Sequence, residues 1–136
     1  MKLNPYLTFD GRCEEAFGFY ERCLGGRIVM MMTYGESPLG SQTDPGWRGK
    51  ILHTTLAVGD QILQGADAPP GRYQKPQGIA VTIGLSDRTE AERIFAALAE
   101  NGVVEFPLRE TFWAARFGMV TDRFGTPWMI NCEKSA

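Results

Sequence analysis

The sequence predicts an α+β fold built from two βαβββ modules, whose mixed sheets curve into a cup. Two observations lead to this fold class. The alternation of apolar and polar residues gives the same order of elements twice, namely a strand, a helix and three strands. Matching residues also recur 76 positions apart, as Leu7 does with Ile83 and Gly26 with Gly102. A repeat of a whole structural unit decides the fold of a chain.

The composition is that of an ordinary globular protein. The 136 residues suit a single domain, with a first module at about 1–66, a linker at 67–78 and a second module at about 79–136. The net charge of −2 argues against nucleic acid as a partner, because phosphate binding needs a concentrated positive face. No apolar run approaches the ~20 residues that span a bilayer, and the first residues lack the apolar segment of a signal peptide. We therefore expect a cytoplasmic protein that binds neither nucleic acid nor membrane.

The first module follows from its periodicity. Leu7 and Phe9 share one face of a short strand. Apolar residues from Cys13 to Leu24 recur at the spacing of one helix face, and Gly25-Gly26 ends the helix because glycine tolerates the left-handed cap conformation. Gly59-Asp60 between two apolar runs is typical of a two-residue hairpin. The predicted elements are strands at 6–9, 27–34, 51–58 and 61–66, a helix at 13–24 and a long loop at 36–49.

The second module repeats the pattern. Asp87 and Glu90 are spaced as a capping box at the start of a helix. The apolar stripe of this helix resembles that of the first, and Asn101-Gly102 closes it. The predicted strands lie at 79–85, 103–113, 116–121 and 127–132. Because side chains alternate across a strand, each sheet has one face for its helix and an opposite face for the cup.

Three segments carry a resemblance to a known family. They are "NPYLTFDGRCEEAFGFYERCLGG", "ILHTTLAVGDQILQGAD" and "RETFWAARFGMVTDRFGTPWMIN". Together they resemble the PhnB-like branch of the vicinal oxygen chelate superfamily, the glyoxalase/bleomycin resistance/dioxygenase proteins. The resemblance implies the glyoxalase/bleomycin resistance fold, a concave pocket and a homodimer. Some relatives carry a ubiquinone-methyltransferase label, but this sequence has no glycine-rich turn between a strand and a helix to cradle a nucleotide-type cofactor. We expect no cofactor.

The resemblance also allows a test for a metal site. Metal-dependent members place His, Glu or Gln ligands on the first and last strand of each module. Here those positions fall on Asn4, Gln64, Ala80 and Met129. Alanine cannot ligate, a thioether is a weak ligand for a hard cation, and asparagine is an uncommon one. One plausible ligand in four positions predicts that the chain binds no metal.

His53 is the only histidine of the chain. If residues 51–58 form the third strand of the module, alternation turns His53 and Thr55 toward the cup and Leu56 toward the helix. One interpretation is a histidine that is hydrogen-bonded within the sheet. The other is a base or donor in the pocket, since an unperturbed imidazole titrates near neutrality. A lone imidazole does not restore a metal site under either interpretation.

The same alternation predicts what lines the cup. Hydroxyls, amides, a phenol and a methionine face it, with aromatic residues at its rim, which suits a small, neutral, partly aromatic molecule. Trp47 from the long loop is a further rim candidate, whereas Trp128 belongs to the core and Asp122 stabilises its own turn. The candidate ligand-binding residues are Asn4, Tyr6, Thr8, His53, Thr55, Gln64, Thr82, Phe112, Trp113, Met129 and Asn131.

Three hypotheses of function remain open. The first is a small-molecule binding protein without a metal, similar to the drug-sequestering members of the superfamily. The second is a metal-dependent lyase, isomerase or dioxygenase with an atypical site at His53 and Gln64. The third is a homodimer with a vestigial pocket that acts through protein partners. The loss of several ligand positions together favours the first.

Overall fold

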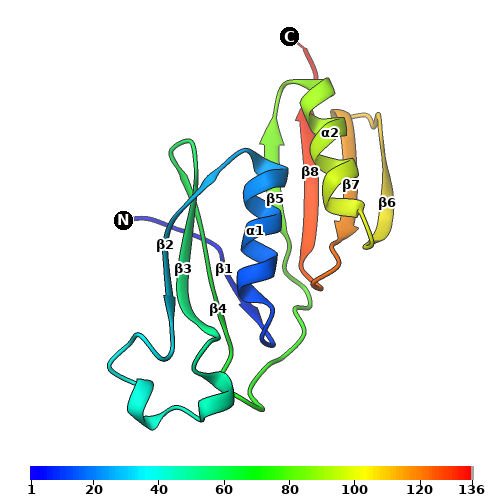
Figure 1. Ribbon diagram of the computed structural model, residues 1–136. Coiled ribbons are helices and arrows are strands. Elements are labelled where there is room, and N and C mark those ends of the chain that lie inside the picture. Colours follow the sequence, from blue (N-terminus) through cyan, green and yellow to red (C-terminus); the bar gives the residue numbers. More distant parts are fainter. Residues whose placement is uncertain (136) are drawn as a thin grey trace. The chain divides into compact units, whose positions relative to one another are not determined.

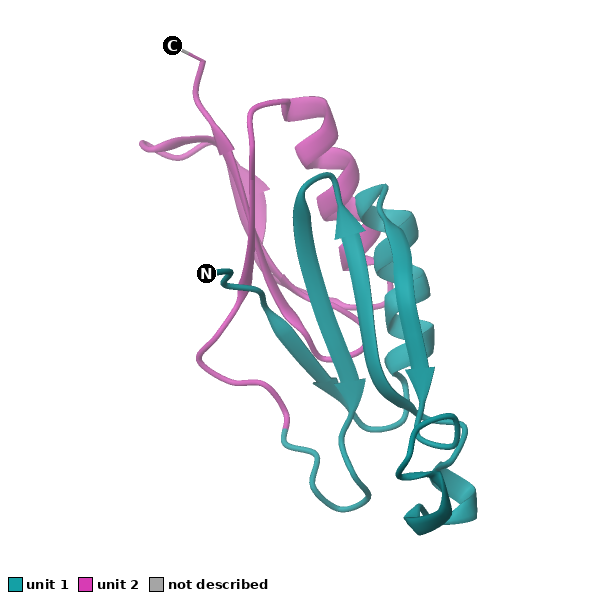
Figure 2. Cartoon of the chain, turned by 90° about the vertical axis from the view of Figure 1, so that its left-hand side faces the viewer, with its two compact units in different colours: residues 1–74 teal, residues 75–136 magenta. Residues whose placement is uncertain are grey.

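A computed structural model describes residues 1–135, and the chain divides into two compact units, residues 1–74 and 75–136. Each unit carries one helix against one face of a four-stranded sheet (Figure 1). The division between the two units is shown in Figure 2, and it falls inside the segment that was predicted to be a linker. None of the helices in residues 1–135 is long and apolar enough to cross a membrane.

Unit 1, residues 1–74, has a mixed sheet with the strand order β1-β4-β3-β2. β1 runs parallel to β4, and the other neighbours are antiparallel. The sheet therefore combines one parallel crossover, made by the helix, with a meander. The elements are β1 (Tyr6–Phe9), α1 (Cys13–Leu24), β2 (Arg27–Thr33), β3 (Ile51–Val58) and β4 (Gln61–Asp67).

Unit 2, residues 75–136, repeats this topology with the strand order β5-β8-β7-β6. Here β5 is parallel to β8, and the other neighbours are again antiparallel. The two predicted βαβββ modules and their mixed sheets are thus confirmed. That their open faces form one cup stays a prediction. The elements are β5 (Val81–Leu85), α2 (Arg88–Ala99), β6 (Val103–Arg109), β7 (Ala114–Thr121) and β8 (Pro127–Glu133).

The largest error in the predicted strands concerns residues 103–113. β6 ends at Arg109, and the following residues turn into β7 through a hydrogen bond from the Thr111 N–H to the Ala114 carbonyl. The Thr111 hydroxyl closes the same turn by accepting from the Ala114 N–H. The apolar alternation continues past Arg109, but a polar residue that bonds its own backbone ends the strand. Phe112 and Trp113 therefore lie in a turn.

The helix α1 begins at a carboxylate from another part of the chain. The side chain of Arg12 makes no cap, and instead Oδ1 of Asp67 accepts a hydrogen bond of 3.0 Å from the Cys13 N–H. A negative charge at the start of a helix satisfies a free N–H and complements the helix dipole. Gly25 ends the helix in the left-handed conformation, with a φ of 69°, as predicted.

The start of α2 confirms half of the predicted capping box. The Asp87 carboxylate accepts a hydrogen bond of 3.2 Å from the Glu90 N–H, which makes Asp87 the N-cap. The Glu90 carboxylate binds the guanidinium of Arg93, one turn further along the helix. The reciprocal half of the box is therefore replaced by an ion pair between residues three apart, which the charge on Arg93 favours.

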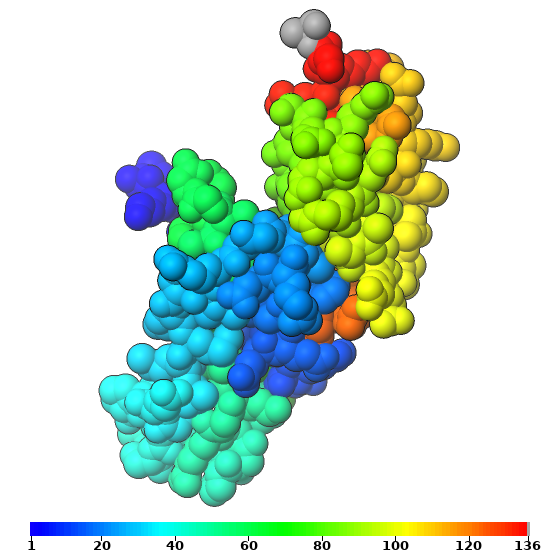
Figure 3. Space-filling view, turned by 45° about the horizontal axis from the view of Figure 1, so that its top comes forward, coloured from blue at the N-terminus to red at the C-terminus, as the bar shows by residue number. Residues whose placement is uncertain are grey.

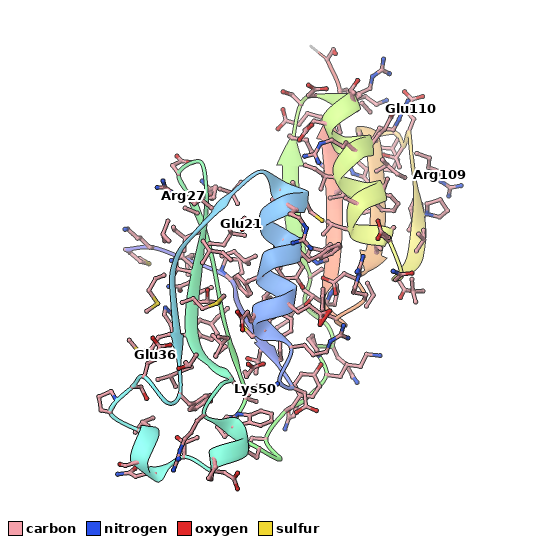
Figure 4. The ribbon with its side chains drawn as sticks, in the orientation of Figure 1. Glu21, Arg27, Glu36, Lys50, Arg109 and Glu110 are labelled. Carbon is pink, nitrogen blue, oxygen red and sulfur yellow. The ribbon has the colours of Figure 1, made fainter. Side chains whose placement is uncertain are left out.

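The long loop between β2 and β3 is more ordered than the sequence predicts. It contains two short 3-10 helices, Gly40–Gln42 and Pro45–Trp47. The Trp47 indole N–H donates to the Ala68 carbonyl, and the Lys50 ammonium donates to the Gly11 carbonyl at 3.0 Å. These two bonds fasten the loop to residues that follow β4 and precede α1, and the expected place of Trp47 at the rim of the pocket stays a prediction. Glu36 and Lys50 mark the two ends of this loop in Figure 4.

A glycine lies directly beneath each helix. A Cβ added to Gly65 on β4 would lie 2.6 Å from the ring of Phe17 on α1. A Cβ added to Gly118 on β7 would lie 2.7 Å from the ring of Phe95 on α2. The two aromatic rings occupy the space that a side chain on the sheet would fill, so each helix packs closely on its sheet.

We expect the Gly65→Ala substitution to lower the free energy of unfolding by about 1–3 kcal/mol, the usual cost of overpacking a core. The added methyl group would press on Phe17 and on the Leu7 carbonyl, which lies 2.8 Å from the ideal Cβ position. Denaturant unfolding measures the change. Gly84→Ala is the matched control, because a Cβ on that strand glycine meets nothing within 4 Å. Equal losses in both variants would contradict close packing at Gly65.

Candidate functional site

The face of the first sheet that points away from α1 gathers polar side chains from three strands. We call it the unit 1 face. Tyr6 on β1 is paired with Gln64 on β4, and Gln64 is paired with Thr55 on β3, so these side chains lie in a row across the sheet. His53 lies two residues from Thr55 and shares its side of the strand. The unit 1 face consists of Tyr6, Thr8, His53, Thr55 and Gln64.

The imidazole of His53 is hydrogen-bonded at both nitrogens. Nδ1 lies 3.1 Å from the Tyr6 hydroxyl, and Nε2 lies 3.3 Å from the Thr55 hydroxyl. The Tyr6 and His53 rings also stack, with centroids 5.7 Å apart and planes inclined by 29°. The phenol reaches His53 across β4, which lies between β1 and β3 in the sheet. Tyr6 remains half exposed, so the chain of three side chains is accessible from outside unit 1.

Burial raises the pKa of Tyr6, and the nearby Cys13 and Tyr34 raise it further. Tyr6 is therefore a neutral phenol at neutral pH. Burial likewise raises the pKa of Cys13, with Asp67 and Glu14 adding to the effect, and the pKa of Tyr34 is raised by burial and by Asp67. All three groups belong to unit 1.

These shifts predict that unit 1 loses stability at alkaline pH. The unfolded chain releases these protons near the ordinary pKa values of 9.0 for cysteine and 10.0 for tyrosine, whereas the folded chain holds them to higher pH. The folded state then binds more protons, so the free energy of unfolding falls as the pH rises above about 9 and stays level between about 7 and 9. Denaturant unfolding across this range measures the slope, and a Cys13→Ala variant should show a shallower one. A rise in stability above pH 9 would contradict the account.

The corresponding face of the second sheet is the unit 2 face. Thr82 on β5 is paired with Met129 on β8, and its hydroxyl lies 3.9 Å from the methionine sulfur. Asn131 follows on the same side of β8, paired with Phe117 on β7. Phe106, Phe112 and Trp113 complete the surface through ring contacts. The unit 2 face consists of Thr82, Phe106, Phe112, Trp113, Phe117, Met129 and Asn131.

Four aromatic rings form a continuous cluster on the unit 2 face. The centroid of the Trp113 ring is 4.8 Å from that of Phe112 and 5.1 Å from that of Phe117, and Phe117 is 5.7 Å from Phe106. The rings meet edge to face, the arrangement that their quadrupoles favour. Phe112 is 90% exposed and Trp113 is 47% exposed. An exposed cluster of this kind is unusual unless it contacts something.

Asn131 is held in one orientation by the cluster. The Trp113 indole N–H lies 3.0 Å from Oδ1 of Asn131. An indole nitrogen only donates, so the amide oxygen must face it. The amide NH₂ of Asn131 is then directed away from Trp113, and among residues 1–135 no hydrogen-bond partner is found for it. The unit 2 face therefore offers a polar donor beside the aromatic rings.

The opposite face of the second sheet packs under α2, as predicted. Trp128 and Ile130 are buried, while their neighbours Met129 and Asn131 lie on the open face. Asp122 is buried and closes the turn before β8, with Oδ1 accepting from the N–H groups of Phe124 and Thr126. Its Oδ2 accepts from the Trp128 indole N–H at 2.8 Å. Both the core position of Trp128 and the turn role of Asp122 are confirmed.

Asn4 and Ala80 lie outside the strands to which they were assigned. Asn4 precedes β1, and Ala80 precedes β5. The first residues of the chain are exposed and project from the surface of unit 1, where they are dark blue in Figure 3. No hydrogen bond or ion pair of the Asn4 side chain is found among residues 1–135, and its part in the site stays a prediction.

Two methionines next to the unit 1 face were missed from the sequence. Met30 on β2 is paired with Thr55, and Met32 is paired with His53, so both lie on the open side of the sheet. The run "MMM" gives no alternation of polarity, and a bulge between Ile28 and Met30 shifts the register of β2. Only the pairing of β2 with β3 shows which of these methionines lie on the open side of the sheet.

The charged residues near β6 pair with neighbours at the surface. The Arg109 guanidinium lies 4.6 Å from the centroid of the Phe106 ring, and the Glu110 carboxylate lies 3.9 Å from the Lys134 ammonium. Figure 4 labels Arg109 and Glu110 at the end of β6. Arg116 binds Glu92 on α2 and so belongs to the helix side. These contacts make all three residues paired surface charges.

Few side chains on the unit 1 face could act as ligands of a metal ion. Among residues 1–135, no group of three or more His, Cys, Asp or Glu side chains is placed to hold one. On the unit 1 face, the imidazole of His53 and the amide of Gln64 are the strongest candidate ligands, and hydroxyls already bind both imidazole nitrogens. A metal at His53 would have to replace one of these hydrogen bonds.

Comparison with known proteins places the chain in a family. A family model described as 3-demethylubiquinone-9 3-methyltransferase matches residues 1–131. The chain belongs to this family. The crystal structure of protein PA1353 from Pseudomonas aeruginosa shares 44% sequence identity, covers 99% of each chain and superposes with a TM-score of 0.91. The relationship therefore covers both units.

More distant structures show the wider fold group. A putative 3-demethylubiquinone-9 3-methyltransferase, a PhnB protein from Bacillus cereus, has 24% identity over 97% of this chain and 99% of its own, with a TM-score of 0.81. A glyoxylase/bleomycin resistance protein/dioxygenase domain from Frankia has 8% identity over 98% of both chains, with a TM-score of 0.69. The predicted PhnB-like membership and glyoxalase/bleomycin resistance fold are confirmed.

Proposed function

We propose that the protein binds a small, partly aromatic molecule on the open faces of its sheets, without using a metal ion. The observation that carries this proposal is the aromatic cluster of the unit 2 face. Its rings stand beside an amide whose NH₂ is free, and they remain accessible although they are large and apolar. Binding sites for small molecules typically combine apolar and aromatic walls with a few placed polar groups.

The unit 1 face supports the same kind of ligand. Its polar groups are neutral hydroxyls, an imidazole and an amide, rather than carboxylates or cations. Such groups orient a neutral molecule through hydrogen bonds without a large cost of burying charge. Met30 and Met32 add flexible apolar surface beside them, which adapts to ligands of different shape.

The family description concerns 3-demethylubiquinone, a molecule with a quinone ring. This description belongs to the family model, and methyl transfer is not part of our proposal. It does suggest one probe, because a quinone combines a flat ring with carbonyl oxygens. A short-chain ubiquinone therefore belongs in any panel of candidate ligands.

A thermal-shift panel tests the proposal. We expect at least one of acetophenone, indole, 1-naphthol and a short-chain ubiquinone to raise the melting temperature, since a ligand that binds only the folded state stabilises it. Trp113→Ala should weaken the binding of that compound about tenfold, because it removes the central ring of the cluster. Leu39→Ala, which shortens an exposed apolar side chain outside both faces, is the matched control. A flat response to the whole panel would contradict the proposal.

A metal-dependent lyase, isomerase or dioxygenase is the alternative. It is favoured by the position of His53 and Gln64 on one face of the sheet, where neighbouring strands carry a nitrogen ligand and an oxygen ligand. Elemental analysis of protein supplemented with Ni²⁺, Zn²⁺, Fe²⁺ or Mn²⁺ separates the two hypotheses. Stoichiometric metal that is lost in a His53→Ala variant would support the alternative, and its absence after supplementation would exclude it.

A further inference from the structure

The side chains of Tyr6, His53 and Thr55 carry one polar hydrogen more than the two hydrogen bonds between them use. The Tyr6 and Thr55 hydroxyls each bring one hydrogen, and a neutral imidazole brings one N–H. These three hydrogens serve only two hydrogen bonds, one between the Tyr6 hydroxyl and Nδ1 and one between the Thr55 hydroxyl and Nε2. Among residues 1–135, no other hydrogen-bond partner is found for either hydroxyl. One hydrogen is therefore always left without an acceptor in this chain of three side chains.

The surplus hydrogen is always on a hydroxyl, but its place depends on the tautomer of His53. If Nε2 carries the proton, Tyr6 donates to Nδ1, Nε2 donates to Thr55, and the Thr55 hydrogen is left over. If Nδ1 carries the proton, it donates to Tyr6, Thr55 donates to Nε2, and the Tyr6 hydrogen is left over. The two tautomers thus present a donor at opposite ends of the same chain.

An unmatched donor costs more than an unmatched acceptor. Buried hydroxyl and N–H hydrogens without an acceptor are rare in proteins, whereas an oxygen with an unused lone pair is common. In the free protein water reaches the surplus hydrogen at either end, because Tyr6 is half exposed and Thr55 is partly exposed. A ligand that covers the unit 1 face removes this water, and it must then supply an acceptor atom itself.

We propose that the unit 1 face recognises an acceptor oxygen of its ligand, such as a ketone or quinone carbonyl, through the surplus hydroxyl hydrogen of the Tyr6–His53–Thr55 chain. Binding of that oxygen selects one tautomer of His53. The inference rests on the proposed small-molecule binding and adds to it the chemical class of the ligand. It also explains a use for a histidine that is bonded at both nitrogens and still faces outward.

The test compares two probes that share a ring and nearly the same shape. Acetophenone has a carbonyl oxygen, and ethylbenzene has none. We expect acetophenone to bind about tenfold more tightly, because ethylbenzene leaves the surplus hydrogen without an acceptor. Ligand-observed NMR at millimolar concentration measures both dissociation constants on the full chain.

The tautomer gives a second readout that simple packing would not change. His53 is the only histidine, so a long-range ¹H–¹⁵N spectrum reports its two ring nitrogens without overlap. The nitrogen shifts of a protonated and an unprotonated imidazole nitrogen differ widely. Acetophenone should drive the Nδ1 and Nε2 signals toward one tautomer, and ethylbenzene should leave them near their values in the free protein.

A double variant supplies the matched control for the hydroxyls. Tyr6→Phe combined with Thr55→Val removes both hydroxyls and retains the shape of the face, so the ratio of the two dissociation constants should approach one. Ser41→Ala removes an exposed hydroxyl elsewhere in unit 1 and should keep the tenfold ratio. A backbone amide ¹H–¹⁵N spectrum confirms that each variant remains folded.

The outcomes separate this inference from the proposed function. If both probes bind the native protein equally and His53 responds equally to them, the acceptor-oxygen inference is overturned and small-molecule binding stands. If neither probe binds and the wider panel is also flat, the proposed function fails, and this inference fails with it. A tenfold preference that survives in the double variant would also overturn the role of the hydroxyls.

Discussion

The Asp67→Asn substitution is expected to lower the free energy of unfolding by about 2–4 kcal/mol, although the two side chains have nearly the same size. Asp67 is 1% exposed, and each carboxylate oxygen accepts one backbone hydrogen bond. Oδ1 binds the Cys13 N–H at 3.0 Å, and Oδ2 binds the Ile51 N–H at 2.8 Å. An asparagine keeps one acceptor and turns an NH₂ group toward the other N–H, so one buried donor loses its partner.

The position of Asp67 makes this loss large. The residue closes β4, its side chain caps α1 and holds the first residue of β3, and its carbonyl accepts from the Tyr34 hydroxyl at 2.8 Å. Removing one bond therefore loosens the helix, the sheet and the long loop together. β3 also carries His53 and Thr55, so the ring nitrogen signals of His53 should broaden or shift in the variant.

Denaturant unfolding of Asp67→Asn and Asp60→Asn gives the comparison. Asp60 lies in the exposed turn between β3 and β4, where the side chain of Gln61 is the one partner of its carboxylate found within residues 1–135. Its substitution should change the free energy of unfolding by less than about 0.5 kcal/mol. If Asp67→Asn is as stable as Asp60→Asn, the carboxylate does not hold unit 1 together as described.

The second large effect is expected in unit 2, where Asp122→Asn should cost about 1–3 kcal/mol of the free energy of unfolding. Oδ1 accepts from the N–H groups of Phe124 and Thr126, and Oδ2 accepts from the indole N–H of Trp128. The two backbone N–H groups and the indole N–H can only donate, so each of them needs an acceptor oxygen. The asparagine amide has only one oxygen, so its NH₂ group would face at least one of these three N–H donors, which then loses its acceptor.

The Asp122→Asn substitution should also affect the unit 2 face, because Asp122 lies just before β8 in the chain. The Asp122 turn leads directly into β8, which carries Met129 and Asn131 on the unit 2 face. We therefore expect Asp122→Asn to change the near-ultraviolet circular dichroism of the tryptophans and to weaken the binding of aromatic probes. Asp60→Asn again serves as the control. An unchanged spectrum and an unchanged free energy of unfolding would show that the indole contact is not important.

The sequence predicts the fold well because the fold depends on patterns that repeat. The matched spacing of Leu7 with Ile83 and of Gly26 with Gly102 already indicates two copies of one unit. The end of β6 was misplaced because apolar residues continue into the turn, where Thr111 bonds the backbone and ends the strand. The hydrogen bond of Trp47 was not predicted because its partner, the Ala68 carbonyl, is 21 residues away in the chain.

The candidate site was predictable in part for the same reason. Alternation along each strand correctly puts Tyr6, His53, Met129 and Asn131 on the open faces. It does not reveal which side chains meet, since Tyr6 reaches His53 across an intervening strand. The orientation of Asn131 depends on Trp113, which the sequence assigned to a strand rather than to a turn. Contacts of this kind depend on strand order and loop shape, which no local pattern contains.

We propose that the open face of each sheet binds a small, partly aromatic molecule. The most direct measurement is a protein-observed NMR titration of the uniformly ¹⁵N-labelled chain with each compound of the thermal-shift panel. At least one compound should cause saturable shift changes in the indole signal of Trp113, the side-chain amide of Asn131 and the ring nitrogens of His53. Amides on the outer surfaces of α1 and α2 should stay unchanged. Shift changes confined to those helix surfaces, or none with any compound up to millimolar concentration, would rule out binding at these faces.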